Sequence, residues 1–146
     1  MLKGISPYVS PDLLKVLHEM GHSDEILLAD AHFPGHSFGR RVLRADGLTI
    51  PQLLGAILPL FELDSSVDPL VMMQPYPGDP MHHDVEADFL QAARPHVAGV
   101  AAPLRLARQA FYERAKAAYA VVMTGETRAY GNLILRKGIT PLTPAL

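Results

Sequence analysis

The chain contains no cysteine and no tryptophan, and charged residues are scarce. Without cysteine, disulfides and thiolate metal sites are excluded. Charged residues make up 19% of the 146 positions, against the ~25% usual for soluble domains. The formal net charge of −2 argues against nucleic acid and anionic membranes as partners, because both select for clustered lysine and arginine.

Long hydrophobic runs are also missing. The longest uncharged apolar run, residues 53–61, includes Gly55 and Pro59 and is far shorter than the ~20 residues that span a bilayer. Residues 1–15 show no basic segment followed by an apolar stretch, so we expect no signal peptide. We therefore predict a cytoplasmic protein that has no membrane association.

Hydrophobic residues are plentiful, at 49% of the chain. A chain of 146 residues favours one domain with a core large enough to fold unaided. We expect a single domain over residues 1–146, with a loose tail at 140–146. A chain with too few charges to coat its surface often covers part of that surface with copies of itself, so we predict a homo-oligomer.

Helical and strand patterns alternate along the chain. Ser10 followed by Pro11 is typical of a helix start, and apolar spacing predicts a helix as far as Met20, with Gly21 left-handed just past its end. Further helices are predicted over 53–61, 85–93 and 104–118, and strands over 26–29, 41–44, 70–73, 119–124 and 133–135. The pattern predicts a single compact α/β domain, with a mixed or mostly parallel sheet and helices on both faces.

Two candidate functional residues flank the strand predicted at 26–29. His22 follows a helix C-terminus, where the helix dipole favours a protonated imidazole; it can act as a general acid or simply cap the last helical carbonyls. Asp30 closes an apolar strand, a position where open α/β sheets place ligands. Its carboxylate needs partners, which a ligand or an Asx turn into Ala31 and His32 can supply.

The spacing of these two residues suggests how a site is assembled. A fully extended link would separate His22 from Asp30 by roughly 26 Å. One pocket within one subunit therefore requires a sharp bend at Ser23-Asp24. Otherwise His22 and Asp30 of different subunits meet across an interface, and this second arrangement is our hypothesis.

Other polar residues carry weaker signals. His32 and His36 have a metal-ligand spacing only on a continuous helix, and Pro34-Gly35 between them predicts irregular backbone. The triplet Tyr130-Gly131-Asn132 combines groups that suit sugar hydroxyls, although Gly-Asn is also an ordinary turn pair. Arg108 borders an apolar helical stripe, where it faces a cleft or lies along the surface. His82 and His83 fall in a polar loop and are expected to be solvated.

Several blocks, in order, resemble the L-fucose mutarotase (RbsD/FucU) family, a close relative of D-ribose pyranase. The resemblance runs from residue 2 to about 138. The blocks are Glu19-Met20-Gly21-His22, Asp24-Glu25, Asp30-Ala31-His32-Phe33-Pro34, Arg44-Ala45-Asp46-Gly47, Pro59-Leu60-Phe61-Glu62-Leu63-Asp64, Phe111-Tyr112-Glu113-Arg114-Ala115 and Tyr130-Gly131-Asn132.

The resemblance implies an isomerase that interconverts the α and β anomers of a free monosaccharide by general acid/base catalysis, without cofactor or metal. It implies His22 as the proton donor. It implies ring-like oligomers, often decamers, with sites at subunit contacts. The substrate-binding positions that it implies are Asp30, Arg108, Tyr130, Gly131 and Asn132.

Alternatives stay open from the sequence. Arg105 competes with Arg108 for the arginine role, and the base opposite His22 is Asp30, Tyr130 or a water. The same groups could serve a D-ribose pyranase, which exchanges pyranose and furanose rings. A non-catalytic sugar-binding module and a His/Asp metalloenzyme are further alternatives.

Overall fold

Short apolar strands alternate with helices in the computed structural model, which describes residues 1–80 and 84–142. The helices are α1 (Pro11–Glu19), α2 (Gly35–Phe38), α3 (Ile50–Ile57), the 3-10 helix η1 (Leu58–Leu60), α4 (Asp84–Ala93) and α5 (Arg108–Ala117). The strands are β1 (Glu25–Ala29), β2 (Val42–Ala45), β3 (Leu70–Met73), β4 (Leu104–Leu106), β5 (Ala120–Thr124) and β6 (Leu133–Arg136). The predicted α/β class is confirmed.

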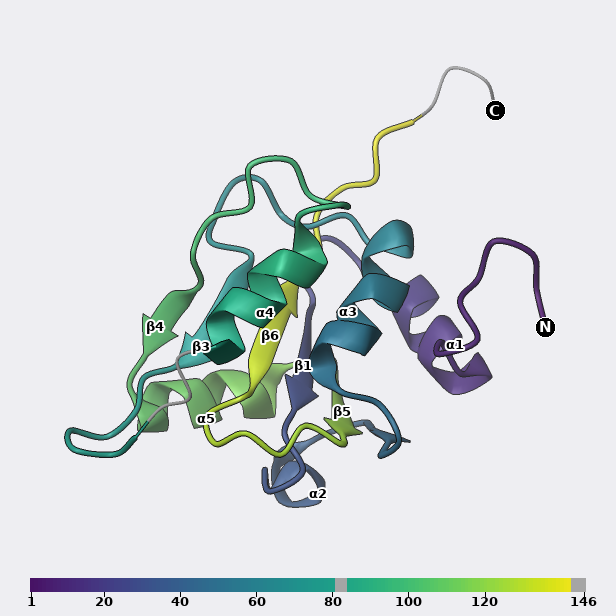
Figure 1. The fold of residues 1–146 in the computed structure, drawn as a ribbon. Helices are drawn as coiled ribbons and strands as arrows, with labels where there is room; N and C mark the ends of the chain where they lie inside the picture. Colours follow the sequence, from purple (N-terminus) through teal and green to yellow (C-terminus); the bar gives the residue numbers. More distant parts are fainter. Residues whose placement is uncertain (81–83, 143–146) are drawn as a thin grey trace.

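The strands of the described residues form one mixed sheet of six strands in the order β2-β5-β1-β6-β3-β4 (Figure 1). Neighbours β2, β5 and β1 run parallel, as do β3 and β4, and β6 runs antiparallel between β1 and β3. Five strands therefore end at one edge of the sheet, where β6 begins. We call this the carboxyl edge and the opposite one the amino edge.

The central strand β1 separates two apolar layers. Ile26 and Leu28 belong to the core that α1, α3 and α4 cover, whereas Leu27 and Ala29 belong to the core beneath α2 and α5. Figure 1 shows α3 and α4 side by side on one face. Because both faces of β1 are buried, its sequence is a continuous apolar run rather than an alternating one.

The helix predicted over 104–118 is wrong at its start. Residues Leu104–Leu106 form β4, an edge strand that pairs parallel with β3, and the helix begins only at Arg108. Leu104 is one of the exposed large hydrophobic residues. The open edge of β3 takes up the backbone of these three residues, so sheet pairing overrides the helical spacing of Leu104 and Ala107.

Two local predictions around the strand β1 also need correction. Gly21 is not left-handed; Met20 caps α1 in an extended conformation, and Ser23 has the positive φ of 73°. Past the strand, Pro34 is followed by the short helix α2 rather than by wholly irregular chain. Gly35 lies against Met123, where an added Cβ would be 2.3 Å from the sulfur, so a larger residue at this position would have to displace the Met123 side chain.

The helix predicted over 53–61 is present with shifted bounds. The α-helix α3 begins at Ile50 and ends at Ile57, and the 3-10 helix η1 follows around Pro59, whose ring does not continue an α-helix. Residues 75–80 form a loop. Residues 140–142 are exposed and have no regular structure, whereas 143–146 and the pair His82 and His83 lie outside the described residues. None of the described helices combines the length and apolar character needed to cross a bilayer.

Candidate sugar-binding site

A cavity of about 210 Å³ opens at the carboxyl edge. Four of the predicted sugar-binding residues line it together: Asp30, Arg108, Tyr130 and Asn132. They come from the end of β1, the start of α5 and the turn before β6. The volume is below the roughly 300–1,000 Å³ typical of drug-sized sites, so the cavity suits a ligand as small as a monosaccharide.

Asp30 is held by a reciprocal pair of hydrogen bonds with Asn132. The Asp30 amide donates to Oδ1 of Asn132 at 2.8 Å, and Nδ2 of Asn132 donates to Oδ2 of Asp30 at 2.7 Å. The His32 amide donates to the other carboxylate oxygen at 2.9 Å. The Asx turn considered from sequence is therefore present, in a carboxylate that also lines the cavity.

Burial governs the charge on Asp30. Its residue is 5% exposed, and this burial raises the pKa of the carboxyl above its ordinary value, although the donors from His32 and Asn132 oppose the shift. The fold thus keeps a carboxyl group at the strand end at some cost in desolvation. A ligand hydroxyl that donates to it would offset part of that cost.

The turn that carries Tyr130, Gly131 and Asn132 is tightly built. Tyr130 adopts a left-handed conformation with φ of 61°. A Cβ on Gly131 would lie 2.8 Å from the Arg128 carbonyl oxygen and 3.1 Å from Cγ of Glu126. Gly131 itself does not line the cavity among the described residues, so its visible role is to allow this close approach.

The phenol of Tyr130 points to the loop over residues 75–80. Its hydroxyl donates to Asp79 at 2.5 Å and accepts from the Tyr76 amide at 3.4 Å. The hydrogen bond to Asp79 is the main reason that the pKa of Tyr130 is raised. The phenol therefore stays protonated at neutral pH and can donate as well as accept.

Arg108, not Arg105, supplies the guanidinium of the cavity. Arg108 opens α5 and its Nε donates to the hydroxyl of Tyr112 at 3.0 Å. The guanidinium also lies 5.4 Å from the ring centre of Tyr76. Arg105 is engaged elsewhere, with Glu86 and the Met73 carbonyl, and does not line the cavity as described.

Sequence reasoning missed the apolar wall of the cavity. Phe33, Met73 and Tyr112 line it, and His32 was weighed only as a metal ligand. Phe33 and Tyr112 stack edge to face, with ring centres 5.8 Å apart. The position of Tyr112 four residues after Arg108 was a usable signal, because side chains at that spacing lie on one helix face.

His22 lies at the opposite, amino edge of the sheet. It lines a separate cavity of about 180 Å³, together with Asp64 and Ile139, and 49% of its side chain is exposed. The strand β1 lies between His22 and Asp30, and its five residues span about 16 Å. The bend at Ser23 does not bring the two predicted residues together, so one chain does not unite them.

The imidazole of His22 faces a buried carboxylate. Its Nε2 lies 3.4 Å from Oδ2 of Asp64, which is only 4% exposed. The side chain and amide of Ser66 both donate to Asp64, as does Arg136. These hydrogen bonds, those of Ser66 above all, lower the pKa of Asp64 to about 2, so a permanent negative charge stands beside the imidazole.

Comparison with known proteins shows the family to which the chain belongs. The model of the RbsD / FucU transport protein family matches residues 3–140. This chain belongs to the RbsD/FucU family. The resemblance predicted from the ordered sequence blocks is therefore confirmed.

Individual RbsD/FucU proteins are similar over almost their whole length. A curated L-fucose mutarotase of Histophilus somni is 55% identical, over 97% of this chain and 99% of its own. The fucose mutarotase of Streptococcus pneumoniae, solved in complex with L-fucose, is 45% identical with a TM-score of 0.90, over 96% of this chain and 100% of its own. The RbsD of Bacillus subtilis solved with D-ribose is 22% identical, covers 97% of this chain and 100% of its own, and has a TM-score of 0.71; it shows the shared fold alone.

The donors and acceptors at the carboxyl edge suit a polyhydroxylated ligand. Asp30 accepts, Asn132 donates and accepts, and Arg108 donates, while the ring of Phe33 offers an apolar surface. Within residues 1–80 and 84–142, no group of three or more histidine, aspartate or glutamate side chains is placed to hold a metal ion. This RbsD/FucU chain thus presents groups able to bind hydroxyls at one edge, and an imidazole beside a carboxylate at the other.

Proposed function

We propose that this protein is an L-fucose mutarotase, an isomerase that interconverts the α and β anomers of free L-fucose. The observation that carries the proposal is the cavity at the carboxyl edge, where Asp30, Arg108, Tyr130 and Asn132 converge beside an apolar wall. The 55% identity with the Histophilus somni L-fucose mutarotase supports this choice of sugar. The absence of cysteine agrees with a reducing compartment, and we propose a cytoplasmic location.

The reaction needs two proton transfers to open the ring, a rotation, and the reverse two transfers to close it. A proton is delivered to the ring oxygen while the anomeric hydroxyl loses one, so the C–O ring bond breaks and an aldehyde forms. The aldehyde rotates, and the ring closes on its other face with the protons returned. Histidine suits this work because the imidazole group both gives and takes protons near neutral pH.

His22 is the proposed proton donor, and Asp64 is its proposed positioning partner. A carboxylate 3.4 Å from Nε2 orients the imidazole ring and limits its rotation. The half-exposed side chain leaves the other ring nitrogen free to reach a sugar. Asp30, Asn132 and Arg108 would hold the hydroxyls, with Asp30 or a bound water as the base. Tyr130, whose phenol stays protonated, would bind a hydroxyl.

A complete site then requires two copies of the chain. Because β1 separates His22 from the Asp30 cavity, the partner subunit's His22 would complete each cavity. We propose a homo-oligomer in which every site lies at a subunit interface. A head-to-tail contact of this kind, amino edge on carboxyl edge, closes into a ring when its rotation allows, which agrees with the ring-like assembly expected from sequence.

Anomer-exchange NMR tests the activity directly. Line broadening or saturation transfer between the α and β signals is measured for L-fucose, D-ribose and D-galactose, with the wild type and His22→Ala. We expect the wild type to accelerate exchange most for L-fucose. A sugar-binding module would bind fucose without accelerating exchange, and preferential action on ribose would indicate a pyranase.

Subunit mixing tests the shared site. His22→Ala and Asp30→Ala chains are each expected to be inactive alone. When the two are refolded together at equal amounts, about one quarter of the interfaces join a wild-type His22 to a wild-type Asp30, and activity returns to that extent. No recovery in mixed oligomers, shown by native mass spectrometry to have formed, would contradict the shared site.

A further inference from the structure

The turn between β5 and β6, residues 125–132, needs support from outside itself. We call it the β5–β6 turn. It carries Tyr130 in a left-handed conformation and Asn132, which bonds Asp30. Three backbone hydrogen bonds hold it: Gly125 to Leu48, Ala31 to Glu126 and Gly131 to Arg128. The side chains of Asn132 and Tyr130 attach the turn to Asp30 and to the loop over residues 75–80 as well. None of these bonds joins the turn to α4.

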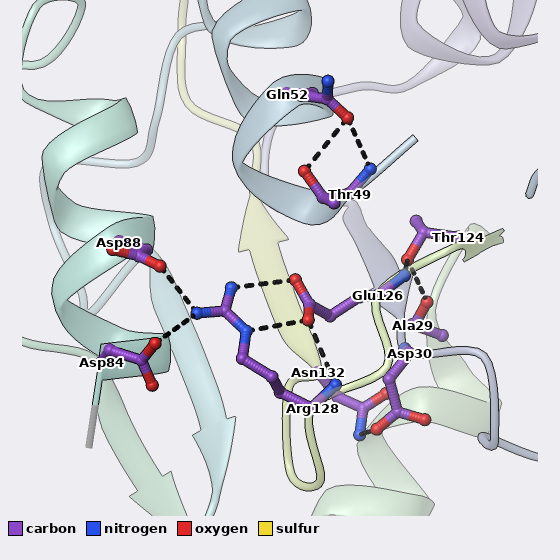
Figure 2. Close-up of polar contacts among 10 residues, drawn as sticks. All are labelled: Ala29, Asp30, Thr49, Gln52, Asp84, Asp88, Thr124, Glu126, Arg128 and Asn132. Atoms are coloured by element: carbon purple, nitrogen blue, oxygen red, sulfur yellow. Dashed lines mark hydrogen bonds and ion pairs between the residues drawn. The ribbon is translucent and has the colours of Figure 1, made fainter. Parts of the chain in front are cut away.

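Arg128 supplies that attachment. Its Nε and Nη2 donate to the two carboxylate oxygens of Glu126 at 2.9 and 3.0 Å, and its amide also donates to Glu126 at 3.1 Å. Its Nη1 reaches Asp88 at 2.6 Å and Asp84 at 3.2 Å, both on α4. Figure 2 shows the guanidinium between the turn and α4. Two parallel hydrogen bonds to one carboxylate fix a geometry that a point charge cannot.

Burial makes this arrangement hard to rearrange. Glu126 is 3% exposed, and burial alone would raise its pKa. The donors from Arg128 outweigh that effect and leave the pKa of Glu126 below its ordinary value. A buried carboxylate that lost its guanidinium would be left without compensation for its charge, so the guanidinium is held on Glu126, with Nη1 directed at Asp84 and Asp88 of α4.

Neither Arg128 nor Glu126 lines the cavity in the described structure. In Figure 2 the guanidinium points away from Asp30, whereas the side chain of Asn132, at the end of the turn, bonds that carboxylate. The Arg128 carbonyl, by contrast, accepts from the Gly131 amide at 3.1 Å. Any influence of Arg128 on a ligand must therefore pass through the backbone of the turn.

We propose that Arg128 is a positioning residue for sugar binding, which closes the β5–β6 turn onto Glu126 and anchors it to α4 so that Tyr130 and Asn132 are held for the ligand. The inference rests on the proposed function, because it assigns the turn to a sugar. The contacts that it supports act on hydroxyls, which are present alike in the bound sugar and in the transition state. Loss of such contacts raises KM and spares kcat.

The test measures both constants by anomer-exchange NMR and the Kd for L-fucose by calorimetry. Arg128→Gln is expected to raise KM and Kd on the order of tenfold, with kcat within about twofold of wild type. Arg128→Lys keeps a charge near Asp88 but loses the bidentate pair with Glu126, so its KM should lie between those of the wild type and Arg128→Gln.

Arg114→Gln is the matched control. Arg114 makes a comparable bidentate pair with Glu25, between α5 and β1, and is similarly part-buried. Its loss should lower the melting temperature while KM stays at the wild-type value. Where Arg128→Gln fails to fold, the double variant Glu126→Gln/Arg128→Gln removes the buried carboxylate together with its guanidinium. Only the exposed carboxylates of Asp84 and Asp88 then lose a partner, and the same rise in KM is expected.

The outcomes separate the inference from the function on which it rests. A wild type that does not accelerate exchange overturns the proposed function, whatever the variants do. A wild type that accelerates exchange, with KM and Kd unchanged in Arg128→Gln or lost equally in Arg114→Gln, overturns the positioning role alone. A fall in kcat at unchanged KM overturns it as well.

Discussion

Each edge of the sheet holds a buried carboxyl group, and the pKa values of these two groups are shifted in opposite directions. At the carboxyl edge, burial raises the pKa of Asp30, whose partners are a side-chain amide and backbone amides. At the amino edge, hydrogen bonds from Ser66 and Arg136 lower the pKa of Asp64 to about 2. The first carboxyl is held by neutral groups in a binding cavity, whereas the second is a permanent anion beside His22. The comparison suggests a division of labour between binding and proton transfer.

Removal of the imidazole should give the largest effect. His22→Ala is expected to lower kcat by roughly 10² to 10⁴, the usual contribution of a positioned acid or base, and to leave the Kd for L-fucose near the wild-type value. Anomer-exchange NMR and calorimetry measure the two. If binding were lost together with the rate, the amino edge would also hold the sugar, and the division would be wrong.

Removal of the carboxyl at the other edge should affect binding and stability together. Asp30→Ala leaves the Asn132 amide and the His32 N–H without their partner, which costs about 1–3 kcal/mol of unfolding free energy. It should also weaken fucose binding by tenfold or more, measured by calorimetry. Denaturant unfolding reports the stability. Unchanged affinity would show that Asp30 serves only its Asx turn.

A single methyl group tests the geometry of the β5–β6 turn. Gly131→Ala would bring a Cβ to 2.8 Å from the Arg128 carbonyl, so the turn must shift, and several-fold weaker binding is expected. Gly55→Ala in α3 is the matched control, because nothing lies within 4 Å of its added Cβ. That variant should gain about 0.5–1 kcal/mol of stability and bind normally. Equal affinity in both would contradict the turn's role.

The smallest expected effect is a pH dependence of opposite sign at the two edges. Because the pKa of Asp64 is lowered from 3.8 in the unfolded chain to about 2 in the fold, this carboxylate stabilises the fold above pH 3.8. That stabilisation is lost as the pH falls toward about 2. The pKa of Asp30 is raised above 3.8 in the fold, so its effect has the opposite sign. Its contribution to stability is fully present below pH 3.8 and is lost as the pH rises through the pKa of the folded state.

Urea unfolding between pH 2.5 and 7 resolves the two signs. The free energy of unfolding of Asp64→Asn should be below that of the wild type near neutral pH, and the difference should shrink as the pH falls. For Asp30→Asn, the free energy of unfolding relative to wild type should be highest near neutral pH. Slopes of the same sign for both variants would mean that the two carboxyls have similar environments.

Much of the fold was predictable because its signals are local. The buried strand at 26–29 and the capped start of α1 were each predicted from neighbouring residues. The edge strand Leu104–Leu106 was not, because its pairing partner β3 lies some thirty residues earlier in the chain. The prediction of a left-handed Gly21 was wrong for a similar reason. The chain turns at Ser23 instead, because the Ser23 amide donates to the carbonyl of Lys137, which is distant in the sequence.

The candidate site was likewise predictable in part: its residue types from the sequence, and their arrangement only from the tertiary structure. The chemistry of Asp30, Arg108, Tyr130 and Asn132, and the family to which they belong, could be recognised in the sequence. Residue types and order carry that information, because hydroxyl recognition needs particular donors and acceptors whatever their surroundings. Only the tertiary structure decided that these four converge, since five strands end at one edge, and that His22 stands at the other edge against Asp64. Strand direction is a property of the whole sheet, and no local stretch of sequence determines it.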